Sequence, residues 1–228
     1  MAAISKDSIT FLKKLGKNND RDWFQENKPE YVKQHEEIIA FADELLGLMN
    51  EHDTIETISG KKSLYRIYRD VRFSKDKAPY KTNWSGGFKR ATKQLRGGYY
   101  FHIQPGGNSF IGGGFWGPSK EDLLRIREEI TTDASEMREI ITSKDFLETF
   151  GTLDGEQLKL APKGFDKEHK NIDLLRYKQF IFGKNFSDEE VLAENFAQVA
   201  NETFKKMRPF FDLMSEILTT DSNGTPID

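Results

Sequence analysis

The order in which hydrophobic periodicities follow one another along the chain is the strongest constraint on its fold. Towards both ends, apolar residues recur every three to four positions, which is the period of an amphipathic helix. Between about residues 84 and 115 they instead alternate with polar residues and glycine, as in a strand. Helices, then strands, then helices is typical of an α+β fold rather than of alternating βαβ units. We therefore expect an α+β protein with a central antiparallel sheet from the middle third, packed against N-terminal and C-terminal helices.

The front half predicts two helices and then a hairpin. Residues 8–15 share an apolar face, Asn19 is placed to cap a short turn, and residues 31–49 keep the helical period most closely. Residues 99–104 and 109–115 alternate on either side of a turn rich in Pro and Gly, which indicates an antiparallel hairpin. Short strands at 64–69 and 84–89 are expected to join it.

Helices are expected to return after Pro118. Ser119, Asp133 and Ser187 are each followed three residues later by an acidic residue, the pattern of a capping box ahead of a helix. The last helical run extends from about residue 196 to residue 214 and contains Pro209. Because proline lacks the amide hydrogen that a helix interior needs, we expect the last helix to bend there.

No segment rich enough in Pro, Gly or Ser divides the chain, so we expect one domain over residues 1–218 and a frayed tail at 219–228. No apolar run approaches the ~18 residues of a membrane helix, and residues 1–15 carry charges where a signal peptide needs apolar residues. We therefore expect a cytoplasmic protein with no membrane partner. The lack of Cys excludes disulfides, thiolate metal sites and cysteine nucleophiles.

The charge is distributed very unevenly. Residues 61–96 contain twelve Lys and Arg against two Asp, a net charge of +10, although the whole chain carries −3. The remainder must therefore carry −13. A basic block of this kind attracts an anion locally, whereas the acidic remainder argues against general adhesion to nucleic acid.

The most distinctive part of this block is residues 66–83, RIYRDVRFSKDKAPYKTN. Together with NNDRDWF at 18–24, GGFWGP at 113–118 and PKGFD at 162–166, it resembles domain of unknown function family 2461, a group of bacterial and fungal hypothetical proteins. The resemblance extends over nearly the whole chain. It implies no activity, so it assigns no catalytic residue to this sequence.

Arg66, Arg69 and Arg72 recur every three residues. A helix or 3₁₀ turn would align them, whereas a strand would place Arg69 on the opposite face, and the sequence leaves both geometries open. The guanidinium fork suits a carboxylate or phosphate, and the nearby lysines add less directional positive charge. Alternatively, Arg69 and Arg72 pair with Asp70, Asp76 or acidic helices and tie a long loop to the body.

Residues 112–117 match the pattern G-x-G-x-x-G between a predicted strand and a predicted helix. That strand belongs to a hairpin, Phe115 and Trp116 crowd the turn, and Pro118 lacks an amide donor, so we expect no dinucleotide and no other cofactor. Glycine does let a ligand approach the backbone closely, and amides at a helix start attract anions. Gly113, Gly114 and Trp116 therefore stay in the candidate site.

Aromatic residues interleave with the basic ones between residues 65 and 100, which suits base stacking but arises equally from core packing on a half-buried sheet, the interpretation that we favour. His102 alternates with Tyr100 and Gln104 on one strand face and is a candidate general base without a partner in the sequence. Asp166, Glu168 and His169 lie among lysines that would repel a cation, so we expect a solvated loop there.

We expect a binding protein for a small ligand with a phosphate or carboxylate group, and the sequence leaves open whether it is an enzyme and how it oligomerises. The alternative is a structural or protein-interaction module whose basic segment pairs with an acidic partner or with its own helices. Nucleic-acid binding is a weaker third class. The candidate anion site comprises Arg66, Arg69, Arg72, Lys75, Lys77, Tyr80, Lys81, Gly113, Gly114 and Trp116.

The purified protein should contain no stoichiometric transition metal. Cys is absent and the four His are scattered, so the sequence offers no set of nitrogen and sulfur ligands at metal-binding spacing. Elemental analysis of the purified chain should find far less than one equivalent of zinc or iron. One equivalent of either would contradict this expectation.

Overall fold

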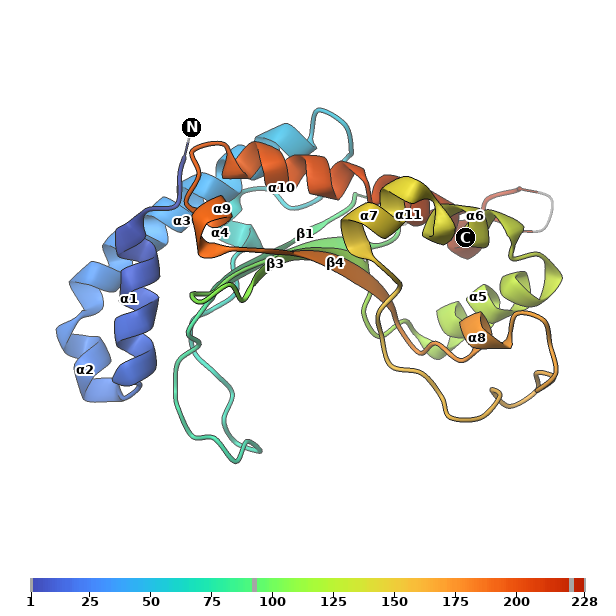
Figure 1. The fold of residues 1–228 in the computed structure, drawn as a ribbon, viewed down its shortest axis with the longest axis horizontal. Coiled ribbons are helices and arrows are strands. Elements are labelled where there is room, and N and C mark those ends of the chain that lie inside the picture. Colours follow the sequence, from blue (N-terminus) through green and yellow to red (C-terminus); the bar gives the residue numbers. More distant parts are fainter. Residues whose placement is uncertain (1, 92–93, 222–223, 228) are drawn as a thin grey trace. The chain divides into compact units, whose positions relative to one another are not determined.

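The computed structural model describes residues 2–91, 94–221 and 224–227, and all structural statements below refer to these ranges. The α+β expectation is confirmed: helices lie at both ends of the chain, and an antiparallel sheet lies in the middle (Figure 1). Within the described residues the sheet has four strands, paired in chain order. These strands are β1 (Trp84–Lys89), β2 (Gly98–Ile103), β3 (Ser109–Phe115) and β4 (Phe180–Phe186).

The first three strands are the ones that the alternating pattern predicts, and β4 is an addition from outside the middle third. The predicted strand at 64–69 does not form. That segment makes only isolated bridges among the described residues, from Leu64 to Gly86 and from Tyr68 to Tyr80. Its pairing is interrupted because the chain leaves the sheet there as a projecting segment.

The described chain divides into two compact units, and each of the four strands contributes residues to both of them. Unit 1 comprises Met1–Phe88, Tyr100–Ile111 and Asn185–Glu202, and unit 2 comprises Lys89–Tyr99, Gly112–Lys184 and Thr203–Asp228.

Unit 1 is built around the long helix α3, as its close 3.6-residue period predicts. Phe41 of α3 packs edge-on against Phe101 of β2 and stacks on Phe196 of α10, with ring centroids 5.7 Å apart in both pairs. Phe11 of α1 stacks on Trp84 of β1. The helices that begin in this unit are α1 (Lys6–Lys17), α2 (Arg21–Glu26), α3 (Lys28–Met49), α4 (Gly60–Ser63), α9 (Asp188–Val191) and α10 (Phe196–Lys205).

Unit 2 has a phenylalanine core on β4. The ring centroid of Phe182 lies 4.9 Å from those of both Phe146 and Phe150 of α7 and 5.2 Å from that of Phe210 of α11. As the sequence predicts, helices return after Pro118, beginning with α5. The helices of this unit are α5 (Lys120–Thr132), α6 (Ser135–Thr142), α7 (Lys144–Phe150), α8 (Ile172–Leu175) and α11 (Arg208–Thr219).

Two of the three predicted capping boxes begin a helix. Ser119 accepts a hydrogen bond from the Asp122 amide at the start of α5, and Ser187 and Glu190 bond reciprocally at the start of α9. Asp133 does not cap α6, because its carboxylate accepts from the Ser135 amide while Ala134 takes the cap position.

The predicted bend at Pro209 is instead a break between two helices. α10 ends at Lys205, α11 begins at Arg208, and the proline lies in the first turn of α11, where no amide hydrogen is needed. Of the predicted tail at 219–228, residues 222, 223 and 228 lie outside the described residues, and Thr220 pairs with Pro226.

Across the ranges that the structure describes, no helix combines the length and the apolar character that crossing a bilayer requires.

Gly114 is required by the contact between β3 and β4. Its φ is +132°, and a Cβ atom built there would lie 2.1 Å from the Phe180 carbonyl oxygen. A side chain at this position would both strain the backbone and force the two strands apart.

Replacing Gly114 with Ala should destabilise the protein strongly. A strained backbone of this kind alone costs about 1 to 3 kcal/mol, before the overlap with Phe180 is counted. Gly47→Ala is the matched control, since a Cβ there meets nothing within 4 Å and the helix interior should gain up to about 1 kcal/mol. Urea unfolding followed by circular dichroism measures both changes. Equal stability of the two variants would contradict the assignment.

Candidate functional site

The distinctive basic segment forms a projecting arm of unit 1, which we define as residues 66–81 (Figure 1). It is neither a helix nor a regular strand. Two backbone hydrogen bonds close its base, from the Arg69 amide to the Pro79 carbonyl at 2.9 Å and from the Lys81 amide to the Ile67 carbonyl at 2.7 Å. The residues between these two bonds belong to no helix or regular strand. Arg66, Arg69 and Arg72 are therefore not aligned on one face of a regular element.

Tyr80 anchors the arm to the N-terminal helices. Its buried ring stacks on Phe24 of α2 with centroids 4.0 Å apart. The Asn19 side chain donates to the Tyr80 carbonyl at 2.9 Å and accepts from the Tyr80 amide at 3.0 Å. Asn19 therefore does not cap α2 as the sequence suggested, and Asp20 does so instead. Tyr80, one of the predicted ligand residues, holds the arm in place.

Arg69 and Arg72 are paired inside the arm. Arg69 donates to Asp76 at 2.6 Å and to the Ala78 carbonyl at 3.0 Å. Arg72 grips Asp70 with both Nε and Nη2, and these hydrogen bonds lower the pKa of the Asp70 carboxyl. The geometry thus agrees with internal pairing to Asp70 and Asp76, and the helices are not the partners.

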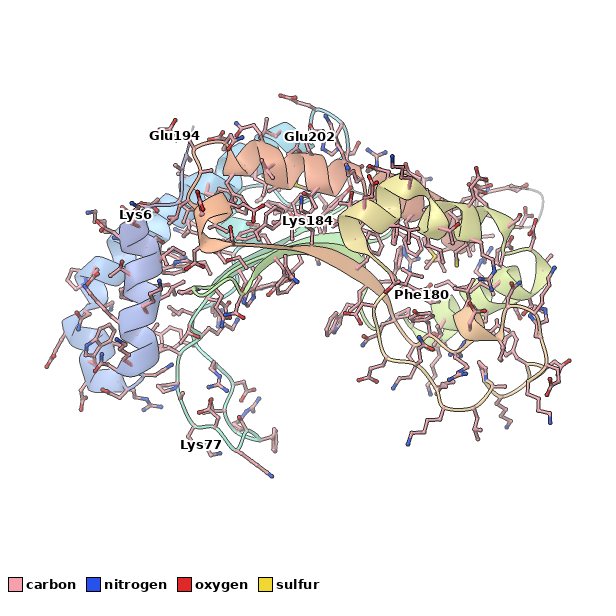
Figure 2. All side chains as sticks on the ribbon, in the orientation of Figure 1. Lys6, Lys77, Phe180, Lys184, Glu194 and Glu202 are labelled. Carbon is pink, nitrogen blue, oxygen red and sulfur yellow. The ribbon has the colours of Figure 1, made fainter. Side chains whose placement is uncertain are left out.

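The far part of the arm is strongly exposed. Lys77, near the end of the arm in Figure 2, donates to the Val71 carbonyl at 3.0 Å. Lys75 is exposed and has no ion-pair partner among the described residues. Phe73 is 96% exposed, the most exposed of the large apolar side chains of the chain that the structure describes.

Lys81 differs from the other cations of the arm. It is half-buried, and no described carboxylate lies within ion-pair distance of its ammonium group. The group lies over the Tyr65 ring, 5.6 Å from its centroid. Burial lowers the pKa of the Lys81 ammonium, because the charged form loses contact with water. Arg66, at the arm's base, is also without a described partner but is exposed.

Next to Lys81, strand β2 presents a polar and aromatic face. Tyr99, Phe101 and Ile103 of this strand are buried in the core, so Tyr100 and His102 point to the other side by alternation. The Tyr65 ring lies 6.1 Å from that of Tyr100. We call this group the open-face cluster, and it consists of Tyr65, Lys81, Tyr100, His102, Gln104 and Phe110.

His102 forms hydrogen bonds with Tyr100 and Gln104. The sequence places these residues on the same strand face but does not predict the bonds. The His102 Nε2 lies 2.8 Å from the Gln104 Oε1, which requires a proton on Nε2, so Nδ1 accepts from the Tyr100 hydroxyl at 3.0 Å. Burial, and to a smaller extent the charge of Lys81, lower the pKa of the imidazole. The ring is therefore neutral at pH 7. With both nitrogens engaged, His102 orients its neighbours rather than offering a free general base.

The glycine cluster lies in unit 2 and serves packing there. A Cβ on Gly113 would lie 2.6 Å from the Met207 sulfur and 2.8 Å from Phe211. Gly113 and Gly114 are interior to β3, so they do not form a turn into a helix, and Trp116 beyond them is 77% exposed. Their predicted participation in an anion site with the arm stays a prediction.

Two further arginines of the basic block are engaged within unit 2. Arg90 has a fully buried side chain that donates to Asp212 at 2.5 Å and to Ser215 at 3.3 Å. Arg96 pairs with Asp122. Lys93 lies outside the described residues. A block that reads as one basic patch in the sequence is therefore divided among separate roles.

The loop with Asp166 and His169 borders a hollow of about 430 Å³ in unit 2, opposite Leu124 and Glu128 of α5. The His169 Nδ1 accepts from the Asn171 amide, so this ring has a structural bond of its own. Over the ranges that the structure describes, no three His, Asp or Glu side chains gather as a metal site would need.

The chain belongs to the DUF2461 family of conserved hypothetical proteins, whose family model matches residues 7–213. No curated protein and no solved structure matches it.

The structure predicts opposite outcomes for two arginines of the same basic block. Arg90→Ala should lower the free energy of unfolding by about 3 kcal/mol, the lower end of the range for breaking a buried pair, because its partner Asp212 is half exposed. Arg72→Ala should leave the midpoint of urea unfolding near that of the wild type, since Arg72 and Asp70 are both exposed. A large loss for Arg72→Ala would show that the arm's internal pairing supports the fold.

Proposed function

We propose that this protein binds, inside the cell, a small ligand with a phosphate or carboxylate group, and that the open-face cluster holds the anion through Lys81. The observation that carries the proposal is the position of Lys81: a half-buried ammonium group, over the Tyr65 ring, without a described carboxylate partner. Arg66 adds a second unpaired cation at the base of the arm.

The electrostatics support an external anion. A cation that loses water without gaining a counterion is unfavourable, and the lowered pKa of Lys81 reflects that cost. His102 is neutral, so it adds no second positive charge beside Lys81. A bound phosphate or carboxylate would offset the desolvation of Lys81, and the repulsion among the remaining cations of the arm would also fall.

The backbone around Lys81 supports a preformed site. Its amide bonds to the Ile67 carbonyl, and the preceding residue, Tyr80, is fixed by Asn19 and Phe24. An ammonium group held on such a frame loses less conformational freedom when the ligand binds than one on a mobile loop. Arg69 and Arg72, the first candidates from the sequence, support the frame in this proposal rather than touch the anion.

The second candidate function is a protein-interaction module, and the arm's end favours it. Phe73 is 96% exposed, and the pairs Arg69–Asp76 and Arg72–Asp70 brace the loop that carries it. Such a loop suits a partner with an apolar pocket and carboxylates around it. If the wild type binds no anion, this candidate takes first place.

Lys81→Met should abolish binding of inorganic pyrophosphate, and Lys81→Arg should retain most of it. Arg72→Ala is the matched control from the same arm and should bind like the wild type, because its guanidinium is already paired with Asp70. Isothermal titration calorimetry measures the affinity, and stabilisation against urea at matched ionic strength gives an independent readout.

Binding should saturate at one site, depend modestly on salt, and weaken as pH rises through the lowered pKa of Lys81, below the ordinary value of 10.5. Citrate provides the same test for a carboxylate ligand. Unchanged binding by Lys81→Met, or loss of binding by Arg72→Ala alone, would contradict the proposed site.

A further inference from the structure

We infer that the ligand of the open-face cluster is a nucleotide unit, in which a phosphate is joined to a nucleobase that stacks on Tyr65. The inference rests on the proposed function and adds the chemical class of the ligand. The cluster combines an exposed aromatic face, an unpaired cation and free amide donors.

The rings of the cluster form a continuous row on one face of unit 1. Tyr65 lies 6.1 Å from Tyr100, Tyr100 lies 5.4 Å from Phe110, and His102 stacks on Phe110 at 4.9 Å. Tyr65, at one end of this row, is 53% exposed, whereas Tyr99 and Phe101 on the opposite face of β2 are almost completely buried. Core packing therefore accounts for the buried rings on the inner face of β2. The row of rings on the outer face remains as a surface on which a ligand could stack.

Lys81 places positive charge beside that surface. Its ammonium group lies over the Tyr65 ring at 5.6 Å, so one small molecule can contact both the ring and the cation. A base stacked on Tyr65 would leave its phosphate within the field of Lys81. An anion without a ring would use the cation alone, whereas a nucleotide would also contact the exposed face of Tyr65.

The edge of the cluster offers hydrogen-bond donors for a base. The Gln104 amide oxygen is bound to His102, and no described group engages its amide nitrogen, so two N–H donors are available. Nucleobases present ring-nitrogen and carbonyl acceptors on their edges. On β1, Gly86 faces Phe101 in the core, so the next residue, Gly87, lies on the open face and adds no side chain over it.

The charge pattern favours one nucleotide rather than a long strand. Grooves for single-stranded nucleic acid combine stacking rings with a positive track along the backbone. Here Arg69 and Arg72 are neutralised by Asp76 and Asp70, and Lys81 and Arg66 are the unpaired cations at the arm's base among the described residues. The same base-plus-phosphate chemistry occurs in a free nucleotide and at the end of a polynucleotide, and the experiment separates these sources.

The test compares adenosine monophosphate, ribose 5-phosphate and adenosine on the full chain by isothermal titration calorimetry. Adenosine monophosphate should bind about tenfold more tightly than ribose 5-phosphate, or better, since a stacked base adds that much affinity. Tyr65→Ala should reduce the ratio of the two affinities to about one, and Tyr65→Phe should preserve the tenfold preference. Phe73→Ala is the matched control, because Phe73 is an aromatic residue of the arm, is 96% exposed and contacts Arg72 instead of the cluster.

The outcomes separate the two proposals. Equal affinity for adenosine monophosphate and ribose 5-phosphate would overturn the nucleotide inference while the anion site stands. If the wild type binds citrate but neither phosphate, the nucleotide inference fails and the anion site stands, whereas binding of neither the phosphates nor citrate would overturn both. A short single-stranded oligodeoxynucleotide identifies the source: affinity close to that of the mononucleotide supports a free nucleotide, whereas much tighter binding with a steep salt dependence supports recognition of a polynucleotide end.

Discussion

The geometry of the candidate site depends on one side chain, the amide of Asn19. It satisfies both backbone hydrogen-bonding groups of Tyr80, a residue 61 positions further along the chain. An asparagine amide can do this because it carries a donor and an acceptor on adjacent atoms, as a neighbouring strand would. With the Tyr80 ring stacked on Phe24, the turn between α1 and α2 thereby fixes the point at which the arm returns to the sheet. Lys81 is the next residue, so its position follows from the same contact.

The arm shows how a highly charged segment can have a defined conformation. Arg72 pairs locally with Asp70, and the Arg69–Asp76 pair spans seven positions and brings the chain back on itself. Exposed pairs of this kind contribute little to global stability, but several together restrict the shapes of a loop that has little apolar packing of its own. The same local pairing removes Arg69 and Arg72 from the pool of cations that an external ligand could use.

The elements that the sequence predicts well are those specified by local interactions. The period of residues 31–49 gives α3, alternation and turn residues give the β2–β3 hairpin, and the Ser187–Glu190 box marks the start of α9. β4 was missed because Lys184 and Asn185 interrupt its apolar alternation, and its position depends on the contact with Gly114 of β3. The strand expected at 64–69 fails for a different reason, since the segment pairs at only two bridges among the described residues before the chain continues into the arm.

For the proposed site, the sequence predicts the segment that contains Lys81 but not the distribution of charge within it. Counting cations over residues 61–96 cannot distinguish Arg90, buried against Asp212, from Arg72, exposed with Asp70, or from Lys81, half-buried and unpaired. The alternation of Tyr100, His102 and Gln104 did indicate a shared face. Their proximity to Tyr65 and Lys81 could not be predicted, because it arises from pairing at the base of the arm, where Asn19 holds the returning chain at Tyr80.

The lowered pKa of Lys81 links this site to the stability of the fold. The unfolded chain holds the lysine proton up to the ordinary pKa, whereas the folded chain releases it at lower pH. Between the two pKa values the unfolded state binds more protons, so the free energy of unfolding rises with pH in that window. Below the folded-state pKa, Lys81 is charged in both states and the fold bears the full cost of desolvating the charge. At pH 7 the folded protein therefore carries an unfavourable charge that Lys81→Met would remove. A bound anion would offset that cost, so in the proposed site ligand binding and stability are coupled through Lys81.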